Sequence, residues 1–205
     1  PKFQPQRQMI KIGVTGGIGS GKSTVCRLFS ERGIPCYEAD GRAKRLMNED
    51  PALREKIIAH FGVESYTEEG LNRPYIAQLV FSDPEALATL NGLVHPAVRE
   101  DFRRWATEQE APYLLLESAI LFSADFAREV DYTLAVVAPE SVRLERTMHR
   151  DGASEEAVRA RMAAQMGDDE LMERADWVLV NLLEEDTAAE VEALDRRLRH
   201  AEPRP

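Results

Sequence analysis

Short apolar runs alternate with longer amphipathic segments along most of this chain. The apolar runs are brief and bounded by turn residues, which is typical of strands. Strands are predicted at residues 9–15, 34–39, 112–117, 131–137 and 177–181. The run at 112–117 suits a parallel strand covered on both faces. Strands that alternate with helices predict an α/β fold, a five-stranded parallel sheet between two helical layers.

The stretch between Asp40 and Ala111 differs because its pattern is helical throughout. A capping residue followed by proline marks several helix starts there. Helices are predicted at 41–48, 51–60 and 74–81, and others begin at Asp83-Pro84 and His95-Pro96. About seventy residues are far more than one crossover between parallel strands needs. We therefore expect a helical substrate-binding insertion at about 41–111.

A further helical segment separates the fourth and fifth strands. Helices are predicted at 141–150 and 154–166, with few large apolar residues, so we expect a mobile lid at about 141–170. A charged amphipathic helix at 184–199 completes the chain. The prediction is one domain over 9–205, with a core of about 9–40, 112–140 and 175–205. Residues 1–8 are interpreted as an extension or an expression remnant.

One glycine-rich stretch carries the strongest chemical signal. Residues 16–23 fit G-x-x-x-x-G-K-[ST], with a strand before them and a helix at 25–32 after them. This is a P-loop, in which backbone N–H groups and a helix N-terminus bind phosphates. Lys22 supplies a cation for the β- and γ-phosphates, and the Ser23 hydroxyl can bind Mg²⁺ together with water. The predicted ATP-binding loop residues are Gly19, Ser20, Gly21, Lys22, Ser23 and Thr24.

Composition narrows the choice of partner. With 26 basic and 36 acidic residues the net charge is −10, so no overall basic field favours nucleic acid. Two cysteines without a C-x-x-C spacing disfavour a zinc site. No apolar run approaches a membrane span, and no signal peptide is visible. We expect a cytoplasmic monomer or weak homo-oligomer that acts on small molecules.

Polar residues follow three predicted strands, where ligands of open α/β sheets bind. They are Asp40, Glu117 and Asn181. Phosphoryl transfer needs a carboxylate that accepts the proton of the attacking hydroxyl, and Asp40 is the first choice. The alternative for Asp40 is a helix N-cap. Glu117 is a candidate substrate-binding residue, and its alternative is a structural hydrogen bond to the following loop.

Three arginines share one face of the helix predicted at 141–150. Arg143, Arg146 and Arg150 fall within about 60° of arc at 100° per residue. Their mutual repulsion costs stability that a phosphate chain would offset, and arginine suits bidentate phosphate contact. The alternative is a solvated face paired with nearby glutamates. Arg146 is the candidate that neutralises transition-state charge.

Motifs along residues 9–181 together resemble the dephospho-CoA kinase family. The sequence contains, in order, Thr15 to Thr24, Glu38-Ala39-Asp40, Leu71-Asn72-Arg73, Val80-Phe81, His95-Pro96, Leu115-Leu116-Glu117, Arg146, Arg150-Asp151, Arg161 with Gln165, and Ala175-Asp176 with Asn181. Short pairs such as H-P are weak alone, but the ordered combination is specific. The sequence departs from the family pattern at Glu38, where aspartate is usual, at Arg143, where glutamine is common, and at Leu182-Leu183, where a glycine-containing turn is common.

The resemblance implies a reaction and further roles. ATP would phosphorylate the ribose 3′-hydroxyl of dephospho-CoA to give CoA and ADP, the last step of CoA biosynthesis. It places Asp40 at the hydroxyl, Arg146 and Arg150 in the lid, and Arg73 and His95 on the substrate subdomain. Asn181 would lie at the adenine end of ATP.

The residues alone leave other functions open. One is a small P-loop kinase acting on a nucleoside monophosphate or a hydroxylated metabolite. A GTPase is disfavoured because N-K-x-D is absent and no D-x-x-G follows the third strand. A non-catalytic ATP-binding module is the third alternative.

Overall fold

The computed structural model describes residues 9–204, so the extension expected at 1–8 lies outside the described residues. The chain divides into two compact units. One, the core unit, contains the described residues up to Tyr37 and those from Glu108 onward. The other, the helical unit, is Glu38–Thr107. The helical insertion expected at 41–111 therefore starts and ends slightly later than the helical unit.

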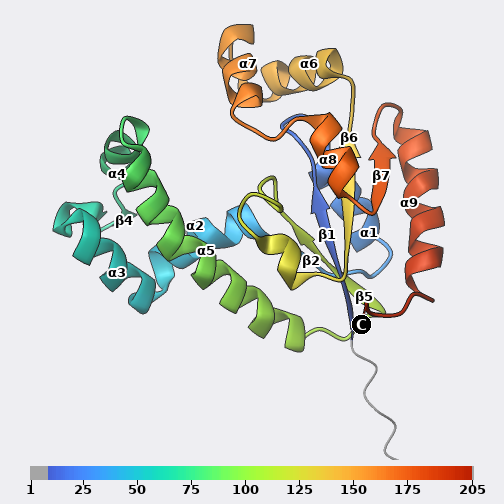
Figure 1. The fold of residues 1–205 in the computed structure, drawn as a ribbon, viewed down its shortest axis with the longest axis horizontal. Coiled ribbons are helices and arrows are strands. Elements are labelled where there is room, and N and C mark those ends of the chain that lie inside the picture. The colour runs from blue at the N-terminus through green and yellow to red at the C-terminus, as the bar shows by residue number, and fades with distance from the viewer. Residues whose placement is uncertain (1–8, 205) are drawn as a thin grey trace, which may run out of the picture. The chain divides into compact units, whose positions relative to one another are not determined.

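A five-stranded sheet forms the centre of the core unit (Figure 1). Its order is β2-β5-β1-β6-β7, and the pairs of β1 with β5, β1 with β6 and β6 with β7 are parallel. The strands are β1 (Ile10–Thr15), β2 (Cys36–Glu38), β5 (Tyr113–Glu117), β6 (Tyr132–Val137) and β7 (Trp177–Val180). Each lies within the run predicted for it, so the predicted sheet is confirmed.

Helices cover both faces of this sheet. On one face α1 (Lys22–Ser30) and α9 (Glu184–Leu198) pack with Leu134 and Val136 of β6. On the other face Ala135 and Val137 pack with Leu171 of α8 (Asp168–Arg174). Consecutive β6 side chains thus enter different layers, and each fully buried leucine or valine contributes about 1.5–3 kcal/mol. The predicted three-layer α/β/α core is confirmed.

The segment between β6 and β7 contains three helices, not two. They are α6 (Glu140–Asp151), α7 (Glu155–Ala163) and α8, while the short helix η2 (Phe126–Glu129) precedes β6. Ser154 caps α7, because its hydroxyl accepts the backbone N–H of Ala157 at 3.2 Å. The helix predicted to reach 166 ends at Ala163 instead, and α8 was not predicted. Its seven residues are largely charged, so helical periodicity could not identify it.

The helical unit contains four helices and a small hairpin. The helices are α2 (Ala39–Glu49), α3 (Pro51–Phe61), α4 (Arg73–Phe81) and α5 (Pro84–Thr107), with the short η1 (Val63–Ser65) after α3. The prediction of helices alone was wrong, because β3 (Tyr66–Thr67) and β4 (Gly70–Leu71) pair antiparallel. Two-residue strands show no periodicity. Asn48 holds this hairpin by accepting the Leu71 N–H at 2.8 Å.

The helix start predicted at His95-Pro96 was also wrong, because α5 runs through Pro96 without interruption. Proline costs one hydrogen bond, to the carbonyl four residues earlier. Here that residue is Gly92, which is exposed, and a β-carbon added to it would meet nothing within 4 Å. Water can therefore satisfy its carbonyl, and buried Val94, Val98 and Phe102 keep the helix packed.

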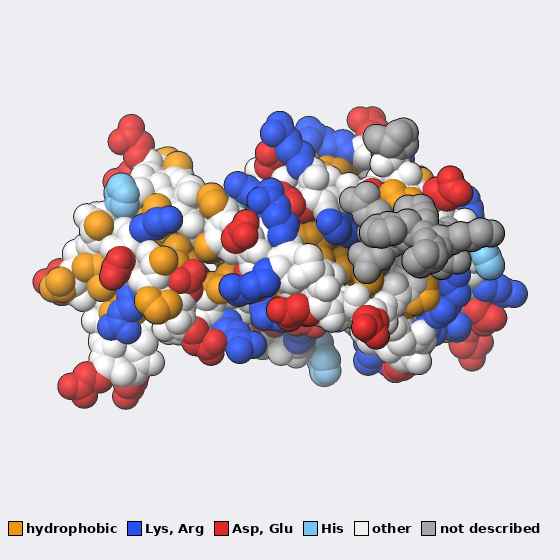
Figure 2. Space-filling view, turned by 90° about the horizontal axis from the view of Figure 1, so that it is seen from below, with side chains coloured by type: hydrophobic (Ala, Val, Ile, Leu, Met, Phe, Trp, Pro, Cys, Tyr) orange, Lys and Arg blue, Asp and Glu red, His pale blue; other side chains and the backbone are white. Residues whose placement is uncertain are grey.

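Charged side chains of both signs are intermingled on the face shown in Figure 2. The acidic excess of the sequence is therefore not gathered there into a single field of one sign. Among the residues that the structure describes, no helix is both long and apolar enough to cross a membrane.

Candidate active site

The phosphate-binding loop joins β1 to α1 and is built on left-handed glycines. Gly19 has φ +77° and Gly21 has φ +90°, a region that other residues rarely adopt. The Ser20 N–H donates to the Gly17 carbonyl at 3.1 Å and closes the turn. Lys22 and Ser23 open α1, whose first turn contains no acidic residue. Its first-turn N–H groups and positive dipole end therefore favour the binding of an anion.

Close packing is a second reason for glycine in this loop. A side chain at Gly17 would collide with the Arg143 guanidinium, and one at Gly19 with the Arg143 carbonyl. At Gly21 it would collide with the amide nitrogen of Asn181. The loop therefore lies directly against α6 and against the residue that follows β7. Its glycines fix tertiary packing as well as the turn.

The lysine and serine of the motif are the first two residues of α1, which begins three residues before the helix start predicted at Val25. The Lys22 ammonium donates to the Gly16 carbonyl at 2.8 Å, and its side chain is half-buried. Ser23 is exposed on the first turn of α1. The described residues contain no group of three or more His, Cys, Asp and Glu side chains that could hold a metal ion. An exposed hydroxyl beside an anion site nevertheless fits Mg²⁺ that is carried by a triphosphate.

Two of the three arginines on α6 reach the phosphate-binding loop. Arg143 Nη1 donates to the Ile18 carbonyl and Arg146 Nη1 to the Gly19 carbonyl, both at 3.4 Å. Arg146 Nη2 also donates to the Leu182 carbonyl at 3.4 Å. Arg150 instead pairs with Asp151, with Nε 2.6 Å from Oδ1. The structure therefore brings Arg143 and Arg146 to the loop and leaves Arg150 on Asp151.

Asp151 is shared by two arginines. Arg161 Nη1 lies 2.7 Å from its second oxygen, Oδ2. Hydrogen bonds from Arg150 and Arg161 hold the pKa of the Asp151 carboxyl well below its usual range. If Arg150 turns toward a phosphate, Arg161 still neutralises this carboxylate.

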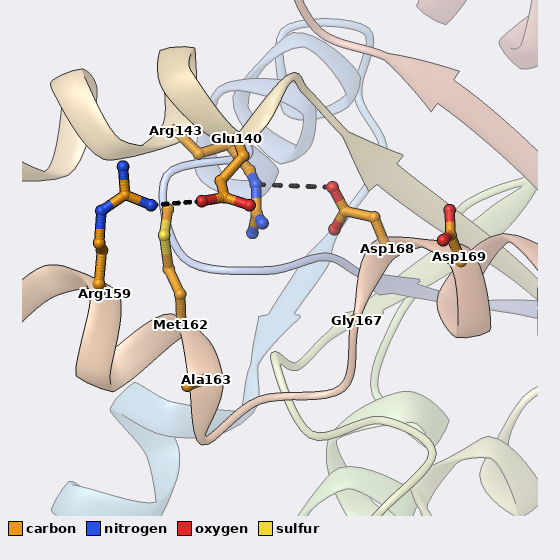
Figure 3. Close-up of a pocket in the computed structure, with 8 residues that line it drawn as sticks. All are labelled: Glu140, Arg143, Arg159, Met162, Ala163, Gly167, Asp168 and Asp169. Atoms are coloured by element: carbon orange, nitrogen blue, oxygen red, sulfur yellow. Dashed lines mark hydrogen bonds and ion pairs between the residues drawn. The ribbon is translucent and has the colours of Figure 1, made fainter.

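A pocket of about 490 Å³ opens beside the loop, between α6, α7 and the start of α8 (Figure 3). Arg143 points across it toward Asp168, with Nε 3.5 Å from Oδ2, while Arg159 and Glu140 pair on the opposite wall at 2.6 Å. Arg143 Nε and Asp168 Oδ1 are buried and have no hydrogen-bond partner. Burial raises the pKa of Asp168, with Asp169 and Glu140 adding to the rise and Arg143 opposing it.

The remaining predicted residues are divided between the two units. In the core unit, Glu117 ends β5 opposite Val14 and is half-buried. In the helical unit, Asp40 is exposed in the first turn of α2, and Arg73 is exposed at the start of α4. Glu38, not Asp40, is the N-cap of α2. This corrects the expectation that the helix begins at Gly41.

His95 lies in the middle of α5 and is half-buried. Burial lowers the pKa of its imidazole, and the neighbouring positive charge of Arg99 lowers it further. The neutral imidazole, which can both donate and accept a hydrogen bond, is thereby favoured.

The Asn181 side chain is buried and contacts the phosphate-binding loop. Its Nδ2 donates to the Ser20 carbonyl at 2.8 Å, and its Oδ1 accepts the Thr187 hydroxyl at 2.8 Å. Sequence reasoning did not select Thr187 or Asp168. A signal existed for Thr187, because it falls on the buried stripe of α9 with Val191, Leu194 and Leu198. A fully buried hydroxyl in an apolar stripe indicates a specific partner.

The three-layer fold and its loop define the protein as a P-loop nucleotide-binding protein. The family model for dephospho-CoA kinase matches residues 10–186, and the chain belongs to that family. A dephospho-CoA kinase of Bacteroides fragilis (strain YCH46) is 40% identical over 173 residues, 84% of each chain. One of Salinibacter ruber is 45% identical over 177 residues, 84% of this chain and 89% of its own. The crystal structure of TT1252 from Thermus thermophilus has a TM-score of 0.82 at 38% identity, covering 93% of this chain and 98% of that one.

Proposed function

We propose that this protein transfers the γ-phosphoryl group of ATP to the ribose 3′-hydroxyl of dephospho-CoA, forming CoA and ADP. Family membership over residues 10–186 carries the choice of acceptor. The phosphate-binding loop and the two arginines at it support the donor half. This is the final step of CoA biosynthesis.

Each part of the loop has a task in this reaction. The N–H groups of Gly19 and of Gly21 to Thr24, with the Lys22 ammonium, bind the phosphate chain, while Ser23 with water would hold Mg²⁺. When bound, the metal neutralises charge on the β- and γ-phosphates. Arg146 stabilises the charge that develops on the transferred group, and Arg150 binds the phosphates after leaving Asp151.

The helical unit supplies the acceptor side of the proposal. Asp40 accepts the proton of the 3′-hydroxyl as its oxygen bonds to the γ-phosphorus. The bond from that phosphorus to the β,γ-bridging oxygen breaks, and ADP leaves. Arg73 and His95 bind dephospho-CoA, with the arginine suited to its phosphates and the neutral imidazole suited to hydroxyl or amide groups. Glu117 positions the substrate at the sheet edge.

A coupled assay of ADP release tests the proposal. The purified protein is given Mg-ATP with dephospho-CoA, with each nucleoside monophosphate, or with small hydroxylated metabolites. We expect ADP release to rise with dephospho-CoA and the product to carry a 3′-phosphate. No stimulation by dephospho-CoA, together with stimulation by another acceptor, would replace this proposal by that of a different small P-loop kinase.

A further inference from the structure

The orientation of the peptide bond between Ser20 and Gly21 decides where one donor of the phosphate-binding loop points. In a planar trans peptide the C=O and the N–H point in opposite directions. Fixing the Ser20 carbonyl on one side of the loop therefore aims the Gly21 N–H at the other. Gly21 is the N-cap of α1, so this N–H stands among the donors that cradle a phosphate chain.

Glycine by itself does not hold such a peptide. Gly21 has φ +90° and ψ 28°, and glycine populates positive and negative φ about equally. The Ser20–Gly21 peptide could rotate at small cost unless another group fixed it. An external constraint is therefore needed at this position.

Asn181 supplies that constraint. Its Nδ2 donates to the Ser20 carbonyl at 2.8 Å, and the side chain lies against Gly21. The amide must point this way, because a backbone carbonyl can only accept a hydrogen bond. Asn181 is itself fixed, since its own N–H donates to the Val137 carbonyl at 2.8 Å and extends the pairing of β7 with β6.

Thr187 fixes the oxygen of the Asn181 side-chain amide. Its hydroxyl lies 2.8 Å from Asn181 Oδ1 and 3.0 Å from the Leu183 carbonyl, and the residue is fully buried. The single hydroxyl proton is shared between these two acceptors, with Oδ1 the nearer, and this bond keeps the amide oxygen turned away from the Ser20 carbonyl and the nitrogen turned toward it. A chain of two side chains thus runs from α9 to the phosphate-binding loop.

We propose that Asn181 and Thr187 are positioning residues that aim the Gly21 N–H at the nucleotide's phosphates. Asn181 then acts through the loop, which differs from the place at the adenine end that the family resemblance implies for it. The inference rests on the proposed nucleotide site but not on the identity of the acceptor.

The test compares variants of one buried hydroxyl with a matched control. Thr187→Val removes the hydroxyl at nearly constant volume, and Thr187→Ser keeps it. Tyr113→Phe removes another buried hydroxyl that also bonds to α9, since Tyr113 donates to Asp195 at 2.6 Å. Calorimetry with Mg-ADP gives the Kd, thermal unfolding gives the Tm, and nitrogen-15 NMR follows the Gly21 amide. None of these readouts depends on dephospho-CoA.

We expect Thr187→Val to raise the Kd for Mg-ADP about 3- to 10-fold, the loss of one net hydrogen bond. The ADP-induced shift of the Gly21 amide should shrink with it. Thr187→Ser should restore both, while Tyr113→Phe should lower the Tm and leave the Kd within about twofold of wild type. If Thr187→Val does not fold, Thr187→Ala removes the same hydroxyl with a smaller side chain and a better helix former.

Two results would overturn the inference. One is an unchanged Kd and Gly21 shift in a folded Thr187 variant that lacks the hydroxyl. The other is an equal rise of the Kd in Tyr113→Phe, because a general loss of core stability would then explain both variants.

Discussion

Gln165 Oε1 accepts the backbone N–H of Ile18 at 2.8 Å, which links the segment after α7 to the phosphate-binding loop. The two residues are 147 positions apart in sequence. Arg143 donates to the carbonyl of the same Ile18 residue. Both backbone groups of Ile18 are therefore held by the segment that we expect to act as a lid, so movement of that segment and exposure of the loop are coupled.

Gln165→Leu should release this backbone group. We expect hydrogen exchange at the Ile18 amide to quicken about fivefold, the effect of one net hydrogen bond of about 1 kcal/mol. Gln165→Glu keeps an acceptor and should keep the protection, while its negative charge raises the KM for ATP in a salt-dependent way. Exchange is followed by mass spectrometry, with Gln78→Leu at an exposed position of α4 as the control. Unchanged exchange in Gln165→Leu would contradict the link.

Arg143 and Asp168 form an ion pair, and its contribution to the free energy of unfolding depends on both side chains. Their side chains are 11% and 23% exposed. Arg143→Gln should lower the free energy of unfolding by about 1–2 kcal/mol, less than for a fully buried pair, because it leaves Asp168 without its cation. Adding Asp168→Asn should recover much of the loss. Urea unfolding of the two single variants and the double variant measures the interaction energy between the two side chains. Strictly additive losses would show that this interaction energy is zero.

Sequence patterns predicted the features that are contained in one short stretch of the chain. Each strand shows its own apolar run, and the P-loop is complete within residues 16–24. The elements that were predicted wrongly are too short to show a pattern or depend on tertiary surroundings. The hairpin of β3 and β4 is too short to show a period, and α8 is short and charged. The continuity of α5 through Pro96 depends on an exposed Gly92 one turn earlier, which no pattern rule records.

The candidate site was predictable only as a set of residue types. Spacing placed Arg143, Arg146 and Arg150 on one helix face, but did not reveal that Asp151 holds Arg150. The contact of Asn181 with Ser20 joins residues 161 positions apart, so no local window contains it. Which donor meets which acceptor is decided by tertiary packing.

Arg146 gives a kinetic prediction. Removing an arginine that stabilises transition-state charge in phosphoryl transfer costs on the order of 10³-fold in rate. Arg146→Ala should therefore lower kcat by about that factor with a smaller change in the KM for ATP. Steady-state ADP release measures both, and Arg174→Ala on α8, an exposed arginine paired with Glu170, is the control. A change confined to the KM would make Arg146 a binding residue.

Asp40 is tested by separating binding from turnover. Asp40→Asn keeps the size and polarity of the side chain but removes the proton acceptor. We expect kcat to fall about 10²- to 10⁴-fold, the usual contribution of a general base, while the Kd for ATP stays near wild type. Glu49→Gln, at the other end of α2, is the control and should keep full turnover. Normal turnover in Asp40→Asn would show that another group accepts the proton.

His95 should make stability depend on pH. Because burial and Arg99 lower the pKa of its imidazole below 6.5, the unfolded chain binds the proton more readily than the folded protein does. The contribution of neutral His95 to the free energy of unfolding is therefore complete above pH 6.5. It is lost as the pH falls from 6.5 toward the folded-state pKa, by at most about 1.4 kcal/mol per pH unit.

The measurement is the free energy of unfolding between pH 8 and about pH 5, in wild type and in His95→Gln. The variant has no imidazole to protonate, so its curve should fall less steeply below pH 6.5, and the two curves should converge toward acid. The difference between the curves isolates His95, since all other titrating groups are common to both proteins. Parallel curves across this range would show that His95 takes up its proton equally in the folded and unfolded chains.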